Sequence, residues 1–275
     1  MTKSPLLAGG LALVATLAAC GTNPGNGQPA PGPAGATLFS NAQDLVRAAT
    51  AKTSQAKSAK MAITESIGGQ QLSGQGSGRF DGPNTAMDVT MNVGGDSEEV
   101  RVVDETMYLR LPAAASGMVT GGKPWARITP DSPMGKMLSS SLSSGQNDPT
   151  QYLQQVQAAG TITRSEQTML DGQQVSHYWI SLDFAKVADK LQSVGIPADQ
   201  LQKLTSQVQT IPLELWLNRD DLPVQVSEDM SAIMKASGAP ASAQTFTATI
   251  SYSDWGTPVD VQAPPADQVG DLQSS

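Results

Sequence analysis

Apolar residues recur with two different spacings along this chain, and the change between the two separates helices from strands. Between Leu38 and Ala49 they recur every three or four residues, which predicts an amphipathic helix over residues 38–53. From Met61 onward the spacing becomes two, as in Met87-Asp88-Val89-Thr90-Met91. That alternation is typical of a strand with one buried face and one wet face.

The rest of the chain follows the same two patterns. Turn sequences such as Gly68-Gly69 and Asp171-Gly172 separate neighbouring strands and are typical of tight hairpins. We expect strands over residues 61–67, 72–80, 87–93, 100–102, 107–111, 125–128, 161–170, 175–182, 211–217, 224–234 and 246–252. Helical spacing predicts further helices over residues 133–142, 149–158, 184–191 and 197–208, whereas residues 112–122 show neither pattern.

The order of these elements predicts the fold class. Hairpin connections make the sheet antiparallel, and helices grouped between runs of strands are typical of the α+β class. A sheet of about ten strands must curl or split. We therefore expect a large curled antiparallel sheet whose concave apolar face is covered by the helices. Gly74, Gly76 and Gly78 alternate along one strand, where they would let another element approach closely.

The N-terminal residues have the pattern of an export signal. Lys3 precedes an apolar stretch from Leu6 to Ala19, and Cys20, the only cysteine, follows it. A charged start, a short apolar run and small residues before the cleavage site are typical of a secretory signal, and this run is too short to span a bilayer. The sequence Leu17-Ala18-Ala19-Cys20 resembles a bacterial lipobox, which implies that Cys20 becomes acylated. The alternative is an ordinary signal peptide that ends near a cysteine.

The lipobox divides the chain into three parts. We expect a signal peptide over residues 1–19, an acylated cysteine and a Gly/Pro-rich tether over residues 20–36, and a single folded domain over residues 37–275. A lone acyl chain anchors a protein only marginally, whereas a lipoprotein cysteine carries at least two chains. The expected location is therefore the extracytoplasmic face of the cell membrane.

The net charge and the potential catalytic or metal-binding residues limit the classes of function that the sequence allows. The chain has 25 acidic and 17 basic residues, a net charge of −8, which disfavours nucleic-acid partners. His177 is the single histidine and lies in an expected strand, so a histidine satisfied within the sheet is favoured over a catalytic base. The sequence holds no nucleophile elbow and no cluster of metal-ligand residues. We therefore expect no catalytic residue, no metal and no cofactor.

Two closing segments carry a family resemblance. They are Leu215-Trp216-Leu217-Asn218-Arg219-Asp220-Asp221-Leu222-Pro223, and the stretch from Tyr252 to Val261 with Ala263-Pro264-Pro265-Ala266-Asp267. With the lipobox, they resemble the LppX/LprG family of actinobacterial lipoproteins over nearly all of the chain after Cys20. The resemblance implies a fold like that of LolA and LolB, an unclosed antiparallel half-barrel whose concave face holds acyl chains. It also implies carriage of a lipid or lipoglycan outside the cytoplasm.

Apolar residues that share one strand face are the candidate cavity lining. Methionine is flexible and suits apolar ligands of varied shape, although it also fills gaps in ordinary cores. The segment from Leu111 to Gly145 could be either a mobile cover or an ordinary surface insertion. The expected lining residues are Met87, Val89, Met91, Val93, Leu109, Leu111, Met134, Met137, Leu213, Leu215, Leu217 and Ile250.

Together these features predict a membrane-anchored exported lipoprotein that binds and carries or presents a lipid or lipoglycan in an apolar cavity. The expected partners are that lipid, the membrane through Cys20, and a transporter or envelope protein. The alternative is a cell-envelope sensor or assembly lipoprotein that binds a protein partner and has no lipid ligand. In that case the protein's own side chains would fill the cavity.

Overall fold

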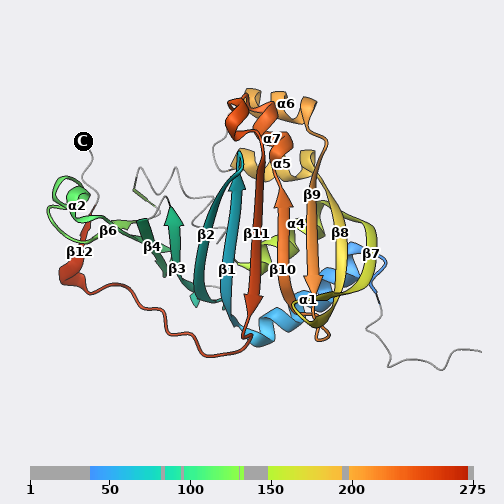
Figure 1. Ribbon diagram of the computed structural model, residues 1–275, viewed down its shortest axis with the longest axis horizontal. Coiled ribbons are helices and arrows are strands. Elements are labelled where there is room, and N and C mark those ends of the chain that lie inside the picture. Colours follow the sequence, from blue (N-terminus) through green and yellow to red (C-terminus); the bar gives the residue numbers. More distant parts are fainter. Residues whose placement is uncertain are drawn as a thin grey trace, which may run out of the picture. The chain divides into compact units, whose positions relative to one another are not determined.

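The described structure is built around one β-sheet. The computed structural model describes residues 38–81, 84–93, 96–129, 131–132, 148–193 and 198–271. Residues from Ala36 onward form one compact unit. Its described part is α+β, and its twelve strands lie in the order β12-β6-β5-β4-β3-β2-β1-β11-β10-β9-β8-β7 (Figure 1). Neighbouring strands are antiparallel except for β12 and β6, and the two ends of the sheet, β12 and β7, are not paired with each other.

The strands and helices have the following bounds. The strands are β1 Ser58–Ile67, β2 Gln70–Arg79, β3 Ala86–Val93, β4 Asp96–Val103, β5 Thr106–Arg110, β6 Trp125–Ile128, β7 Gly160–Leu170, β8 Gln173–Asp183, β9 Thr210–Leu217, β10 Pro223–Asp229, β11 Phe246–Ser253 and β12 Val269–Asp271. The described α-helices are α1 Ala42–Ala56, α2 Ala113–Val119, α4 Pro149–Ala159, α5 Phe184–Ser193, α6 Ala198–Gln207 and α7 Ser231–Ala236, with short 3₁₀ turns at Ala241–Ala243 and Ala266–Gln268.

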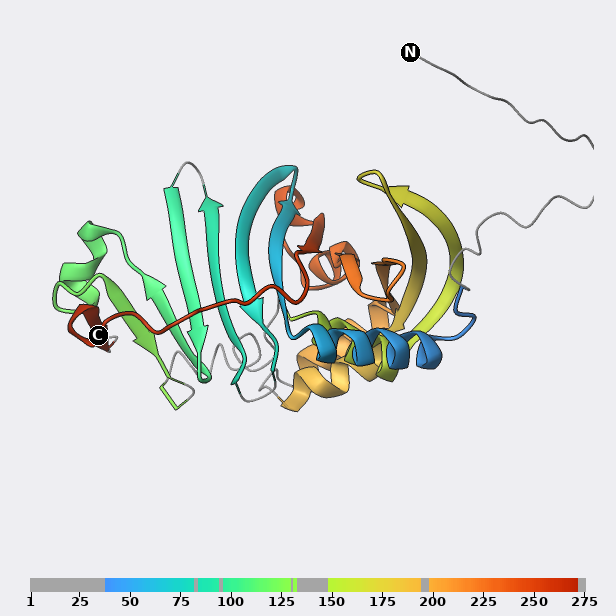
Figure 2. The same cartoon turned by 90° about the horizontal axis from the view of Figure 1, so that it is seen from below.

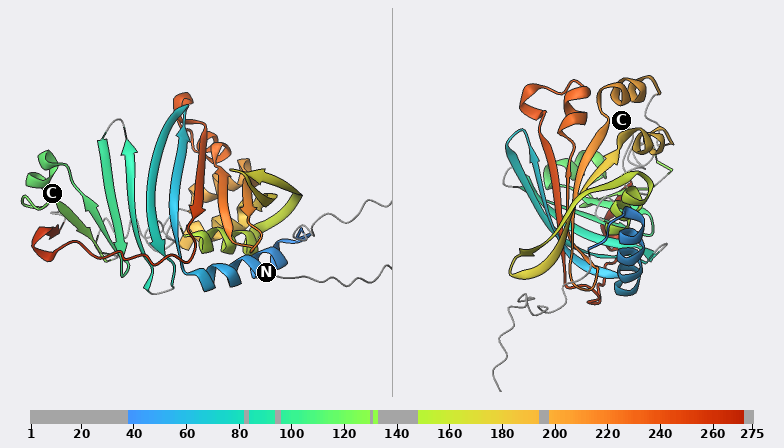
Figure 3. Two further views of the ribbon diagram at one scale, coloured as in Figure 1. Left: turned by 60° about the horizontal axis from the view of Figure 1, so that its bottom comes forward. Right: turned by 90° about the vertical axis from the view of Figure 1, so that its right-hand side faces the viewer.

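Local sequence explains where the hairpins turn. Both residues of the turns Gly68-Gly69 and Asp171-Gly172 have positive φ, as a two-residue turn of this hand requires. Asp104 and Glu105 adopt the same conformation without a glycine, at φ 50° and 58°. The hairpin prediction is confirmed at Gly68-Gly69 and Asp171-Gly172, and Asp104-Glu105 forms a third hairpin turn. A long connection, residues 254–268, then passes the ends of β1 to β5 and brings β12 beside β6 (Figures 1 and 3).

The core lies on one face of the sheet. A hydrogen-bonded row across five strands places Tyr178, Leu215, Val226, Ile250 and Ile63 side by side, and all five are buried. On this side α4 packs against β7 and β8, α1 packs against α4 and α5 packs against β8 (Figure 2). Asn41 caps the start of α1 by accepting a hydrogen bond from the Asp44 backbone at 2.9 Å.

The glycines of β2 permit close packing. A Cβ atom added to Gly74 would lie 2.3 Å from Met91 Sδ, and one added to Gly76 would lie 2.2 Å from the Asp88 carbonyl oxygen. At Gly78 the added atom would lie 2.7 Å from the Phe80 ring. The prediction that these glycines allow another element to approach is confirmed, and the element is mainly the neighbouring strand β3.

Two local predictions are wrong, and one short strand was not predicted. Residues 224–234 were expected to form one strand, but β10 ends at Asp229, whose side chain accepts a hydrogen bond from the Ser231 backbone at 2.9 Å and starts α7. Residues 112–122 contain α2, because three consecutive alanines favour a helix. The three-residue β12 shows no alternation that sequence analysis could detect, and it is parallel to β6. The helix expected over residues 133–142 lies outside the described residues.

Gly76→Ala should lower the free energy of unfolding by roughly 1–3 kcal/mol, since the new methyl group meets a backbone oxygen that cannot turn away. Gly117→Ala is a matched control, because no atom lies within 4 Å of its added Cβ. The control should be neutral or stabilising by about 0.5–1 kcal/mol, since alanine favours a helix. Urea denaturation measures both, and equal stability of the two variants would refute the close packing.

Candidate functional site

The predicted lining residues separate into a packed group and a half-buried group. Leu213, Leu215 and Leu217 on β9 are 1%, 1% and 0% exposed, and Ile250 on β11 is 3% exposed. All four belong to the hydrophobic core that also contains residues of α1, α4 and α5. The protein's own side chains therefore fill this half of the apolar face.

The second group extends the same face over β3, β4 and β5. Val89, Val100 and Leu109 are in register across these strands, and so are Met87, Val102 and Met107. Met87 and Val89 are buried and belong to the same packed core as the leucines of β9, whereas Met91, Val100, Val102, Met107, Leu109 and Leu111 are half-buried. An apolar surface of several side chains thus continues beyond the packed core.

The described helices cover this surface unevenly. Apart from the contacts of α1, α4 and α5 with β7 and β8, α7 packs on β11 and α2 packs on β6. Among the described residues, no helix packs comparably against β2 to β5. Cys20, Met134, Met137 and the side chain of Val93 lie outside the described residues.

A carboxyl group lies within the apolar face and was missed from the sequence. Glu228 on β10 is in register with Ala248 on β11, which is in register with Glu65 on β1. Burial raises the pKa of Glu228 to about 7, and no ion pair or hydrogen bond of the described residues involves its side chain. The alternation of Val224, Val226 and Glu228 was the signal, because it assigns Glu228 to the buried side.

Tyr152 brings a hydroxyl group to the same region. It belongs to α4 and packs against the core, and burial raises the pKa of its hydroxyl. The carboxyls of Glu228 and Glu65 contribute further to this shift. The apolar side of the sheet therefore contains a small polar group of one phenol and two carboxyls.

His177 is held by its neighbours. Its Nε2 atom lies 2.7 Å from Glu214 Oε2. The centroid of its ring lies 3.5 Å from the centroid of the Trp179 ring and 4.1 Å from that of the Trp216 ring. Burial lowers the pKa of His177, against the opposing effect of Glu214. The prediction of a satisfied histidine within the sheet is confirmed.

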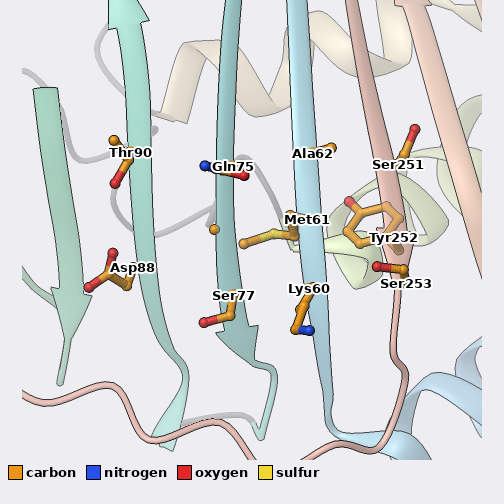
Figure 4. A pocket seen from close by; sticks show the side chains of 11 residues that line it. Lys60, Met61, Ala62, Gln75, Ser77, Asp88, Thr90, Ser251, Tyr252 and Ser253 are labelled. Atoms are coloured by element: carbon orange, nitrogen blue, oxygen red, sulfur yellow. The ribbon is translucent and has the colours of Figure 1, made fainter. Parts of the chain in front are cut away.

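A hollow of about 510 Å³ lies on the opposite, polar face of the sheet, over β11, β1, β2 and β3 (Figure 4). The hollow is open because lining residues such as Ala62 and Ser251 have small side chains. The hollow could not be found from the sequence, because its lining depends on which strands become neighbours in the sheet. Its lining residues are Lys60, Met61, Ala62, Gln75, Gly76, Ser77, Asp88, Thr90, Ser251, Tyr252 and Ser253.

The described residues contain neither a group of metal-ligand side chains nor a helix that could span a membrane. Within those ranges, no three His, Cys, Asp or Glu side chains are grouped so that they could hold a metal ion. Across the same ranges, no helix has the length and apolar character to cross a membrane.

Comparisons with known proteins find one curated protein and several solved structures that are similar to this chain. No protein-family model matches the chain. A Streptomyces griseus protein described as "uncharacterized 31.2 kDa protein in rplA-rplJ intergenic region" is 26% identical over 246 residues, which is 81% of this chain and 76% of that protein. Among solved structures, lipoprotein LppX of Mycobacterium tuberculosis matches 80% of this chain and 98% of its own, with a TM-score of 0.48 and 14% identity. LprF of Mycobacterium bovis matches 81% of this chain and 96% of its own, with a TM-score of 0.45 and 17% identity.

LppX, whose family the sequence resembles, and LprF are thus among the solved structures that match this chain. Both TM-scores are below 0.5, so the function must be inferred from the residues of this chain.

Glu228→Gln should change how stability depends on pH. A carboxyl with a raised pKa binds its proton more tightly in the folded state, so its stabilising effect is full below about pH 4.5 and is lost as the pH rises through about 7. The free energy of unfolding of the wild type should therefore fall over this range, by roughly 1–3 kcal/mol more than that of the variant. Thermal melts from pH 4 to pH 8 measure the difference.

The exposed Glu98 of β4 offers a matched control for this experiment. Glu98→Gln should leave the wild-type pH dependence unchanged. A Glu228→Gln variant that follows the wild type at every pH would show that this carboxyl is not buried.

Proposed function

We propose that this protein is a membrane-anchored lipoprotein that binds a lipid or lipoglycan by its acyl chain on the apolar face over β2 to β5. The observation that carries the proposal is the row of half-buried apolar side chains over β3 to β5, against which no described helix packs as α4 packs on β8. A continuous row of half-buried apolar side chains offers a surface on which an acyl chain could pack. Such packing would contribute about 0.8 kcal/mol for each methylene removed from water.

The shape of the site forms part of the proposal. A sheet that curls into a half-barrel would place β3 and β5 opposite the helices and turn their apolar side chains inward. Glu228 and Tyr152 would offer polar contacts to a headgroup at the boundary of the packed core.

Anchoring follows from the lipobox. Acylation of Cys20 would hold the domain at the extracytoplasmic face of the cell membrane, on a tether formed by residues 21–36. The ligand would then come from, or go to, the adjacent membrane, with a transporter or envelope protein as a possible exchange partner. No catalysis is needed for this function.

The second candidate is an envelope lipoprotein that binds a protein and no lipid. The full burial of Leu213, Leu215 and Leu217 favours this second function, because the protein's own side chains already fill that half of the apolar face. The half-buried group over β3 to β5 favours the lipid-binding function instead.

Leu109→Trp should remove bound lipid and leave the fold intact, because Leu109 is half-buried on the apolar face. Tyr108→Trp is the matched control, since Tyr108 is its neighbour in β5 and faces the other side of the sheet. Organic extraction of the purified proteins followed by mass spectrometry measures lipid per chain. Wild-type stoichiometry in Leu109→Trp, with an unchanged melting temperature, would contradict the proposed site.

Cys20→Ala should move the protein from the membrane fraction to an unprocessed or released form, because the acyl anchor is lost. Fractionation and metabolic labelling with a radioactive fatty acid measure the change. Continued labelling and membrane retention of the variant would refute anchoring through Cys20.

A further inference from the structure

The hollow on the polar face differs in chemistry from a lipid site. Hydroxyl and amide side chains surround it, including Gln75, Ser77, Thr90, Ser251 and Ser253 (Figure 4). Covering these groups with an acyl chain would remove them from water, and each group left without a hydrogen-bond partner costs about 1–3 kcal/mol. Any ligand that fills the hollow must therefore supply many hydrogen-bonding groups.

The hollow also carries little net charge. Lys60 Nζ lies 2.7 Å from Asp254 Oδ2, and Arg101 Nε lies 2.8 Å from Asp88 Oδ2. Its two charged lining residues, Lys60 and Asp88, are thus each paired with a neighbour, although the chain as a whole carries −8. Such a surface gives no advantage to a phosphate, a nucleic acid or a strongly charged peptide.

An aromatic platform lies in the same hydrogen-bonded row. The row runs from Trp216 through Gln225, Ser251, Ala62 and Gln75 to Thr90. At strand spacings of about 4.8 Å, it is roughly 24 Å long. The Trp216 ring stacks on the His177 ring with an interplanar angle of 15°, and Ser251 Oγ donates a hydrogen bond to Gln225 Oε1 at 3.3 Å. Gln225 therefore links Ser251 of the hollow to the strand position beside Trp216.

We propose that this row, from Trp216 to the hollow at Gln75 and Thr90, is a second binding site, and that its ligand is an uncharged polysaccharide chain. A saccharide has many hydroxyl groups for the amides and hydroxyls of the hollow, and its C–H faces pack on a tryptophan ring. The length of the row suits an extended chain of several sugars. The site lies on the face opposite the proposed lipid site, and it does not depend on whether lipid binds there.

Affinity electrophoresis tests this site with the detergent-solubilised, acylated protein. Native gels are cast with dextran, galactan, arabinan or mannan, and with polygalacturonate as a charged comparison. At least one neutral polysaccharide should retard the wild type more than polygalacturonate does. Gln75→Ala should weaken that binding by roughly three- to tenfold, the loss expected for about one hydrogen bond.

Two further variants sharpen the test. Ala62→Glu places a larger side chain in the middle of the hollow and should abolish retardation, while lipid per chain and the melting temperature stay at wild-type values. Gln71→Ala is the matched control, since Gln71 is an exposed glutamine of β2 outside the hollow, and it should bind as the wild type does.

The proposal is overturned if no neutral polysaccharide retards the wild type, or if Ala62→Glu is retarded equally. A photo-crosslinker at position 75 that captures a protein, with no retardation in any gel, would assign the face to a protein partner instead. In all these outcomes the lipid measurement of the same samples reports on the proposed lipid function separately.

Discussion

The pairing of β1 with β11 is the interaction on which the rest of the structure depends. Strands β1 to β6 follow one another in the sheet, and so do β7 to β11, but only the β1–β11 ladder joins the two series. Its register, from Lys60 with Ser253 to Ile67 with Phe246, places Ile63 beside Ile250. Because side chains alternate, a slip of one residue would turn the apolar face of one series toward the polar face of the other.

Neighbouring contacts reinforce this register at one end of the ladder. The Gly256 backbone donates a hydrogen bond to the Ser58 carbonyl at 2.9 Å, and Ser58 Oγ donates one to the Thr257 carbonyl at 2.6 Å. Trp255 Nε1 donates to the Pro223 carbonyl at 2.8 Å and connects β10 to the same corner. These residues lie within the closing segments that carry the family resemblance, which gives those segments a structural role.

The register between β1 and β11 gives the sheet one continuous apolar face and one continuous polar face. On the apolar side, the helices fill the half built by β7 to β11, and the half over β3 to β5 keeps half-buried methionine, valine and leucine side chains. On the polar side, small hydroxyl-bearing residues leave a hollow between longer ones. A lipid is thus the proposed ligand of one face and a sugar chain the proposed ligand of the other.

Much of this could be predicted from the alternation of residues, and the remainder could not for physical reasons. Periodicity located most strands, and positive-φ turn residues located the hairpins, because both are local properties. The pairing of β1 with β11 joins residues far apart in sequence, so neither the packed burial of Leu215 nor the hollow at Gln75 was accessible from pattern alone. Asp229 accepts a hydrogen bond from the Ser231 backbone where β10 ends and α7 begins, whereas apolar spacing alone extended the strand to Met234. Glu228 was not singled out from the sequence, although its position two residues after Val226 places it on the apolar face.

Native mass spectrometry of the purified wild-type protein tests the central claim most directly. The spectrum should show the acylated chain together with an additional non-covalent mass of a lipid or lipoglycan, lost on collisional activation. A spectrum of the acylated chain alone, from protein prepared in several mild detergents and after incubation with envelope lipids, would contradict the lipid-binding account and favour a partner-binding lipoprotein.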